Sequence, residues 1–265
     1  MSFPLLGRHN ERLKLVRSLD TAAERERSGL FLAEGLRVVG ELLNSPLKVR
    51  LLLCQVEASP EARELAWKAL ASGTEVYEVE DRLLEQVAPA KTCQGVVAVA
   101  ELPRYAWRDL LSCPRLLVLD GVQDPGNTGT LLRSARAFGF SGALCVGGAD
   151  PFNARAVRSA AGAAFVLPVL RIQTKPGGSD WSARLAEAGY GLVTAAAHGG
   201  VPLSEAVFPE RAALVLGAEV SGISEAASSR ALLQVTIALS GACESLNVAA
   251  AGAVLMYEMN RRQGS

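Results

Sequence analysis

IALSGACESLNV, residues 237–248, joins a buried strand, a tight loop and a helix start in one short stretch. The aliphatic run 235–239 predicts the strand, which Ser240-Gly241 ends, and the spacing of apolar residues after 248 predicts the helix. The loop holds three polar side chains beyond what a turn needs, those of Glu244, Ser245 and Asn247. A helix start has free backbone N–H groups, which can bind a ligand or be capped by Ser245. A capped core helix and a ligand-binding loop both fit this stretch.

Composition limits the class of protein. Of 265 residues, 49% are hydrophobic and only 5% aromatic, so the core must be aliphatic, as in α/β proteins with buried Val, Leu and Ala. The formal net charge is zero, because 27 Lys plus Arg balance 27 Asp plus Glu. This balance argues against a nonspecific polyanion binder and leaves a local basic face open.

The five cysteines are scattered and never form a C-x-x-C pair, which is typical of small buried hydrophobes in a reducing compartment. With two histidines and no clustered thiols, no metal site is expected. The sequence shows neither a signal-peptide pattern nor an apolar run of membrane-spanning length. We therefore expect a soluble, cytoplasmic protein with no membrane partner.

The first part of the chain predicts a small α/β sandwich domain over residues 1–105. Helices are expected at 10–27, 36–44 and 60–71, and strands at 29–35, 49–54, 75–79 and 95–100. Seven basic residues between 8 and 37 are interspersed with acids, so a solvated helix is the default and a phosphate-contacting face the alternative. Two prolines, Pro103 and Pro114, bracket the expected linker, residues 106–112.

The second domain is expected over residues 113–265. Strands are predicted at 116–120, 143–146, 166–172, 191–197 and 212–216, and helices at 130–140, 153–165 and 181–189. Repeated strand, glycine loop and helix units predict a mostly parallel sheet with helices on both faces. Ligands of such sheets bind at the carboxyl ends of the strands.

Three of those strand ends carry unusual polar loops, at 127–133, 217–222 and 240–247. Their glycines let backbone approach a ligand closely, and their side chains offer a guanidinium, carboxylates, hydroxyls and amides. The P-loop, the G-x-G-x-x-G dinucleotide fingerprint and the G-x-S-x-G elbow are absent from the sequence. The residues alone predict a nucleotide-like ligand bound in an unfamiliar way.

At these loops the chain resembles the SpoU-type, or TrmH, family of RNA ribose methyltransferases. Three family motifs match in order: N-x-G-x-x-x-R at 127–133, G-x-E-x-x-G at 217–222, and I-x-x-x-G-x-x-x-S-L-N-V at 237–248. Together they are highly specific, whereas any one alone would be weak. The N-terminal part is similar to the substrate-binding domain of many members, through 31–35 and 94–99.

The resemblance implies a C-terminal domain folded as a deep trefoil knot, which binds S-adenosylmethionine in a bent conformation and works as a homodimer. From the strand pattern alone an unknotted sheet would be expected, because threaded chains are rare. The resemblance assigns four residues to the cofactor: Gly217, Ile237, Leu239 and Leu246. Ile237, Leu239 and Leu246 could equally be core residues, and the two roles are compatible.

The resemblance also implies the reaction, methylation of a ribose 2′-hydroxyl, and the residues that carry it: Arg133, Asn127, Glu219, Ser245 and Asn247. Arg133 has the central role, and because guanidinium hardly ever loses its proton, we interpret it as a phosphate and alkoxide contact. Ribosomal RNA is the expected substrate. Transfer RNA, methylation of a base, and a noncatalytic RNA-binding protein with the same fold are the alternatives, with an ordinary nucleotide-cofactor enzyme as a remote one.

Two departures from the family pattern stand out. Ala238-Leu239 occupies the place where members commonly have Pro-Met, which removes a rigid residue from a cofactor-binding turn. In RSAAG, residues 158–162, the hydroxyl is displaced by one position from the common R-x-S-x-G. We expect the first to alter cofactor affinity and the second to alter a substrate contact.

Overall fold

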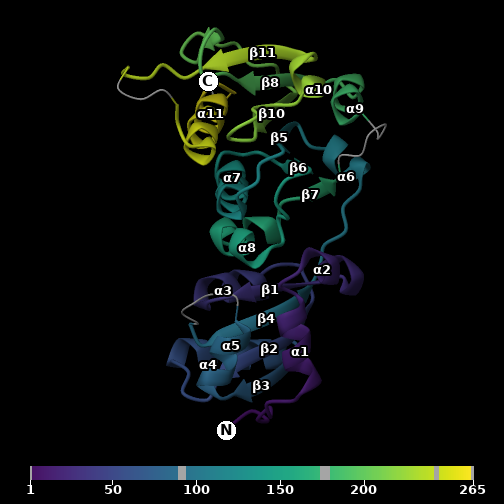
Figure 1. Ribbon diagram of the computed structural model, residues 1–265, viewed down its shortest axis with the longest axis vertical. Coiled ribbons are helices and arrows are strands. Elements are labelled where there is room, and N and C mark those ends of the chain that lie inside the picture. The colour runs from purple at the N-terminus through teal and green to yellow at the C-terminus, as the bar shows by residue number, and fades with distance from the viewer. Residues whose placement is uncertain (1, 89–93, 174–179, 242–244, 264–265) are drawn as a thin grey trace. The chain divides into compact units, whose positions relative to one another are not determined.

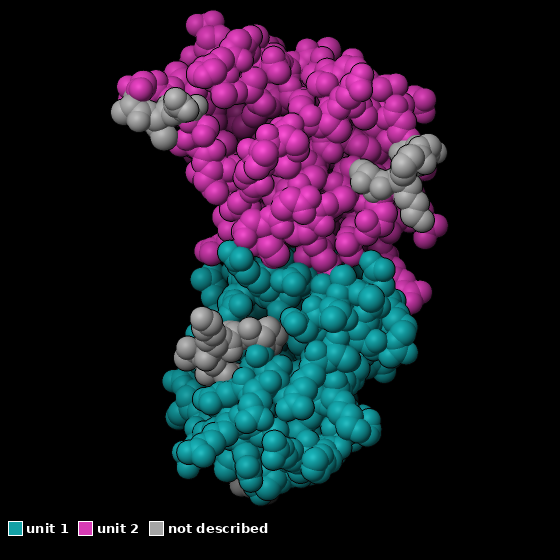
Figure 2. Space-filling model, viewed as in Figure 1, with its two compact units in different colours: residues 1–103, 152–166 teal, residues 104–151, 167–265 magenta. Residues whose placement is uncertain are grey.

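The structure is a computed structural model that describes residues 2–88, 94–173, 180–241 and 245–263. The chain forms two compact units, one of residues 1–103 and 152–166 and one of residues 104–151 and 167–265 (Figure 2). Segment 152–166 therefore packs with the N-terminal residues although it is distant from them in the chain. The domains expected from the sequence, 1–105 and 113–265, stay a prediction.

The first unit is a mixed sheet with the strand order β1-β4-β2-β3. Its strands are β1 (Leu30–Glu34), β2 (Val49–Gln55), β3 (Glu75–Val79) and β4 (Val96–Glu101). Its helices are α1 (Glu11–Ser18), α2 (Ala22–Ser28), α3 (Leu36–Leu43), α4 (Pro60–Ala71), α5 (Asp81–Val87) and α8 (Ala154–Ala160), followed by the 3-10 turn η1 (Ala163–Phe165). Helices α1 and α5 share one aliphatic core with the sheet, which gives the expected α/β sandwich.

Two helices predicted as continuous are broken. The predicted helix 10–27 is α1 and α2, because Thr21 takes an extended conformation and its side chain caps the second helix. The predicted helix 153–165 ends at Ala160, since Ala161 and Gly162 have φ angles of 46° and 89°. A Cβ on Gly162 would lie 2.8 Å from Cβ of Glu41, so this break also allows close packing.

The second unit contains a seven-stranded sheet with the order β7-β6-β5-β10-β8-β11-β9. Its strands are β5 (Arg115–Asp120), β6 (Gly142–Val146), β7 (Val169–Ile172), β8 (Gly191–Ala195), β9 (Val201–Pro202), β10 (Ala212–Gly217) and β11 (Ala231–Thr236). In the described part of the chain all strand pairs of this sheet are parallel, which confirms the predicted fold class.

Helices cover both faces of the parallel sheet, as expected. They are α6 (Trp107–Leu111), α7 (Pro125–Ala137), α9 (Trp181–Glu187), α10 (Glu225–Ser228) and α11 (Val248–Gln263). In Figure 1, α7 and α11 lie together on one side of the sheet and α6, α9 and α10 on the other. A Cβ on Gly252 of α11 would lie 2.3 Å from Leu131 of α7 and 2.7 Å from Leu216 of β10, so α11 packs tightly there. Among the described residues, no helix is both long and apolar enough to cross a bilayer.

The stretch 237–248 differs from its prediction in two ways. The strand expected at 235–239 is β11, which ends at Thr236, so Ile237 and Leu239 lie beyond the sheet. The first residues of β11 alternate between partly buried and exposed positions, and Leu232 is 69% exposed, so they lack the buried character expected of the strand. The cap of α11 is Asn247 rather than Ser245, because Asn247 Oδ1 accepts from Ala249 N at 2.9 Å. Glu244 lies outside the described residues.

Candidate active site

Helix α7 begins earlier than the sequence predicted, at Pro125 instead of Thr130. Asp124 caps it, since Asp124 Oδ1 accepts from Asn127 N at 2.8 Å, and a proline fits the first turn because its missing N–H has no partner to lose there. Asn127 therefore lies in the first turn of a helix and not in a loop. The cap holds its backbone, so its side chain starts from a fixed position.

A chain of hydrogen bonds links the three loops singled out in the sequence. Asn127 Nδ2 donates to Glu219 Oε1 at 2.7 Å, and Asn247 Nδ2 donates to Asn127 Oδ1 at 3.3 Å. These residues follow β5, β10 and β11, whose carboxyl ends share one edge of the sheet. The amide of Asn127 keeps one N–H and one acceptor lone pair for a further partner.

Glu219 sits in a tight loop after β10. Ala218 and Gly222 exchange two backbone hydrogen bonds, of 3.0 and 2.9 Å, which close the loop. Gly217 makes this possible, because a Cβ there would lie 2.3 Å from the backbone C and O of Gly222. Between the closing residues the chain is exposed, and Val220 at its tip is 100% exposed. The loop presents the Glu219 carboxylate to Asn127.

A pocket of about 140 Å³ opens beside this polar chain. It is lined by Ala195–Ala197, Ile237, Leu239, Ser245, Leu246 and Ala251. The lining is small and aliphatic with one hydroxyl, as suits a ligand with a flat apolar part and few polar groups. Three of the four residues assigned to the cofactor by resemblance therefore share one pocket. Gly217 is not among the described lining residues.

Arg133 lies on α7 two turns beyond Asn127, toward the middle of the helix, and its side chain is exposed. The structure gives it no hydrogen bond or ion pair with any residue in the described ranges. Its guanidinium is therefore available to an anion from solution. Ser245 contributes to the pocket wall.

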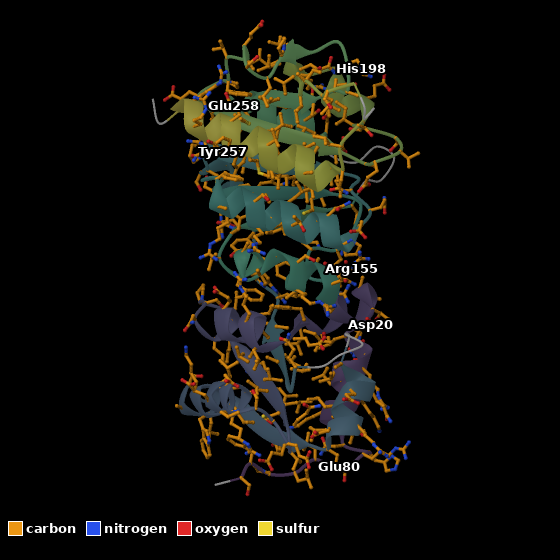
Figure 3. All side chains as sticks on the ribbon, turned by 90° about the vertical axis from the view of Figure 1, so that its left-hand side faces the viewer. Asp20, Glu80, Arg155, His198, Tyr257 and Glu258 are labelled. Carbon is orange, nitrogen blue, oxygen red and sulfur yellow. The ribbon has the colours of Figure 1, made fainter. Side chains whose placement is uncertain are left out.

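Sequence reasoning missed two parts of the site. The first is the pocket wall formed by Ala195–Ala197. A run of small residues at the end of a parallel strand, before Gly199-Gly200, is the sequence pattern that could have predicted it. His198 follows this wall in an exposed loop (Figure 3). The second is Asp120, the last residue of β5, which is only 6% exposed and accepts from Ser224 N at 2.6 Å.

The described residues offer neither a reactive thiol in β6 nor a metal cluster. Burial raises the pKa of Cys145, in β6, to about 12, so its thiol stays protonated at neutral pH. Within the described ranges, His, Cys, Asp and Glu form no group of three or more that could hold a metal ion. The described site combines amides, carboxylates and a hydroxyl with an apolar pocket, and Arg133 is exposed on α7.

Comparisons with known proteins identify the family of the chain. Residues 114–257 match the SpoU rRNA Methylase family, and residues 10–98 match the MRM3-like substrate binding domain. The 23S rRNA (guanosine(2553)-2'-O)-methyltransferase RlmP of Bacillus subtilis (strain 168) is 33% identical over 251 residues, 94% of this chain and 96% of that protein. The 23S rRNA (uridine(2479)-2'-O)-methyltransferase of Streptomyces viridochromogenes is 31% identical, over 91% and 85%.

Solved structures extend the likeness to the whole fold. The AdoMet-bound rRNA methyltransferase from Sinorhizobium meliloti superposes with a TM-score of 0.83 at 29% identity, covering 98% of this chain and 97% of that one. The SpoU methyltransferase AviRb from Streptomyces viridochromogenes, in complex with AdoMet, gives 0.83 at 28% identity over 97% and 99%. The family match spans more than half of the sequence and includes every residue of the polar chain and the pocket. The chain belongs to the SpoU rRNA methylase family.

Proposed function

We propose that this protein transfers a methyl group from S-adenosylmethionine to a ribose 2′-hydroxyl of RNA, with 23S ribosomal RNA as the substrate. The observation that carries the proposal is the chain Asn247–Asn127–Glu219 beside an apolar pocket at the carboxyl edge of the sheet. The names of the relatives in Bacillus and Streptomyces supply the class of RNA. Such a function requires ribosome assembly nearby, so the cytoplasm remains the proposed location.

The pocket residues fit the cofactor of the family. Ile237, Leu239 and Leu246 would hold its apolar adenosine part, while Ser245 and backbone groups would bind its polar groups. When bound, S-adenosylmethionine supplies an electrophilic methyl group at a sulfonium centre. Gly217 stays a proposed cofactor residue, because the absence of a side chain there lets the β10 backbone approach the cofactor closely.

Arg133 is the residue proposed to act on the hydroxyl. A ribose hydroxyl is a weak acid, so its oxygen develops negative charge as it reacts, and a nearby guanidinium stabilises that charge. The same guanidinium can hold a phosphate of the RNA in a forked contact. It is not a base, because it keeps its proton in proteins. The proton leaves the hydroxyl to a phosphate oxygen or to water.

The polar chain is proposed to orient the ribose. Asn127 is held on both sides, by Glu219 and by Asn247, which leaves one N–H and one lone pair of its amide for the ribose. Glu219 acts as an anchor for that amide rather than as a base. Holding the reacting groups in near-attack geometry supplies a large part of the rate enhancement in reactions of this type.

The test is transfer of labelled methyl groups to separate pools of unmodified ribosomal and transfer RNA. The variants are Arg133→Ala and a matched control, Arg136→Ala, which removes an arginine from the same helix three residues later. We expect label in an alkali-resistant dinucleotide of ribosomal RNA, a loss of about 10²-fold or more in the rate for Arg133→Ala, and little change for Arg136→Ala.

The outcomes separate the alternatives. Label in transfer RNA alone would contradict the choice of substrate, and label on a base would contradict the reaction. Intact 50S assembly intermediates serve as a third pool. Cofactor binding without methyl transfer to any of the three pools would favour a noncatalytic RNA-binding protein. An Arg133→Ala protein that methylates at a normal rate would refute the role of that residue.

We also propose that the protein works as a homodimer. Val254 and Tyr257, one helical turn apart on α11, are 42% and 54% exposed, and the Tyr257 ring meets the Phe138 ring edge-on. Light scattering after gel filtration should give twice the chain mass for the wild type and a monomer for Tyr257→Asp. Val207→Asp is the control, because Val207 is also an exposed valine, outside α11. A monomeric wild type would contradict the proposal.

A further inference from the structure

The hydrogen bond between Asn127 and Glu219 joins an exposed carboxylate to a half-exposed amide. Water competes for both groups, so the net stabilisation from such a bond is small, about 1 kcal/mol. A bond of this kind holds its geometry only where the two backbones that carry it are fixed by other contacts. The contacts that fix them converge on one short segment, residues 120–124.

At the end of that segment, Asp124 holds Asn127 through the cap of α7. At its start, the buried carboxylate of Asp120 accepts from Ser224 N at 2.6 Å, on the far side of the Glu219 loop. Asp120 is also the direct neighbour of Gly217 in the sheet register. The Glu219 loop therefore leaves the sheet beside Asp120 and returns to the same side chain.

The segment itself is held from its other side. Gly121 N donates to Val146 O at 2.9 Å, at the end of β6. A Cβ on Gly148 would lie 2.4 Å from Val122 O, so the loop after β6 is packed directly against the segment. The backbone at Asp120 is thus held by β10 on one side and by the end of β6 and the loop after it on the other. A carboxylate on a backbone fixed in this way can set the position of the loop that carries Glu219.

We propose that Asp120 is a positioning residue of the methyl transfer, which acts on the reaction only by holding the Glu219 loop against Asn127. A charged acceptor suits this task, because hydrogen bonds to carboxylates are shorter and stronger than those to neutral groups. The inference rests on the proposed function for its kinetic part, and its structural part stands without it.

The structural test is amide hydrogen exchange of Ser224 and Gly222, which needs no substrate. In Asp120→Ala the Ser224 N–H loses its acceptor, so we expect its exchange, and that of the loop-closing Gly222 N–H, to become at least about tenfold faster. The matched control is Asp109→Ala, which removes a carboxylate that accepts from Ala106 N at the start of α6. It should leave Ser224 and Gly222 unchanged. Unchanged exchange in Asp120→Ala would overturn the proposal.

The kinetic test is a double-mutant cycle with Glu219→Ala. Alone, Asp120→Ala should lower kcat by about 10- to 100-fold, because a misplacement near 1 Å is enough for such a loss, and leave cofactor affinity unchanged. In the Glu219→Ala background it should change kcat by less than about twofold. Asp120→Asn keeps an acceptor oxygen and should recover most of the rate.

Independent effects of the two substitutions would show that Asp120 acts elsewhere, and would also overturn the proposal. A wild type that transfers no methyl group would contradict the proposed function, while the exchange measurement would still decide whether Asp120 holds the loop. A merely structural role predicts lower stability in both Asp→Ala variants, with no dependence of the kinetic effect on Glu219. Urea unfolding of both variants measures that contribution separately.

Discussion

Gly217→Ala tests how closely the Glu219 loop must approach the sheet. A Cβ at this position would lie 2.3 Å from C and O of Gly222 and 2.4 Å from Ile223 N. Carbon atoms in contact are about 3.5 Å apart or more, so the loop must retreat by about 1 Å. The two closing bonds between Ala218 and Gly222, now 3.0 and 2.9 Å, would then exceed the usual limit of about 3.2 Å.

Two effects of different size follow from that retreat. The loss of two backbone hydrogen bonds should lower the free energy of unfolding by about 1–3 kcal/mol. The 2.7 Å bond from Asn127 to Glu219 would also break, which should lower kcat by about 10²-fold. Urea unfolding followed by circular dichroism measures the first effect, and single-turnover methyl transfer measures the second.

The control is Gly7→Ala, since a Cβ on Gly7 would meet no atom within 4 Å. It should change neither quantity. Cofactor affinity, measured by calorimetry, separates loop displacement from a direct contact of Gly217 with the cofactor, because only the contact predicts a large loss of affinity. A Gly217→Ala protein with normal stability and a normal kcat would refute the reasoning.

Three further predictions concern single groups. Asn247→Ala removes the cap of α11 and should lower the free energy of unfolding by about 1 kcal/mol in urea; an unchanged midpoint would contradict the cap. Hydrogen bonds from two arginines lower the pKa of Glu258 (Figure 3) to about 2 from 4.5, so this group adds stability above pH 4.5 that is lost as the pH falls toward 2. Glu258→Gln should therefore flatten the fall in melting temperature across that range, and an unchanged slope would argue against the effect. Cys145, with its pKa raised to about 12 by burial, should resist alkylation at pH 8 until the protein unfolds, as peptide mapping would show.

The location of the site could be predicted from the sequence because it depends on local order. Strand, polar loop and helix recur along the second half of the chain, and parallel strands bring their carboxyl ends to one edge. The individual partners could not be predicted in this way. Asn127 and Glu219 are 92 residues apart, and only the strand order, with β10 beside β5, brings them within hydrogen-bonding distance.

The errors in element boundaries have local causes. Gly126 and Gly129 made the start of α7 look like a loop, whereas the Asp124 cap stabilises a helix there. Hydroxyl and amide side chains both cap helices, so sequence alone did not separate Ser245 from Asn247 as the cap of α11. In each case a side chain that caps the helix within its own segment decided between two local patterns of similar strength.

Leu246 and Asn247 are consecutive residues, yet one lines the apolar pocket and the other hydrogen-bonds to Asn127. A ligand that displaces the peptide between them must change both halves of the site. The affinities for the two substrates are then thermodynamically linked, and the linkage is reciprocal. An inhibitor that pushes Leu246 outward would weaken RNA binding by the same factor by which RNA weakens the inhibitor. The potency of pocket-directed compounds would thus depend on the RNA concentration at which they are assayed.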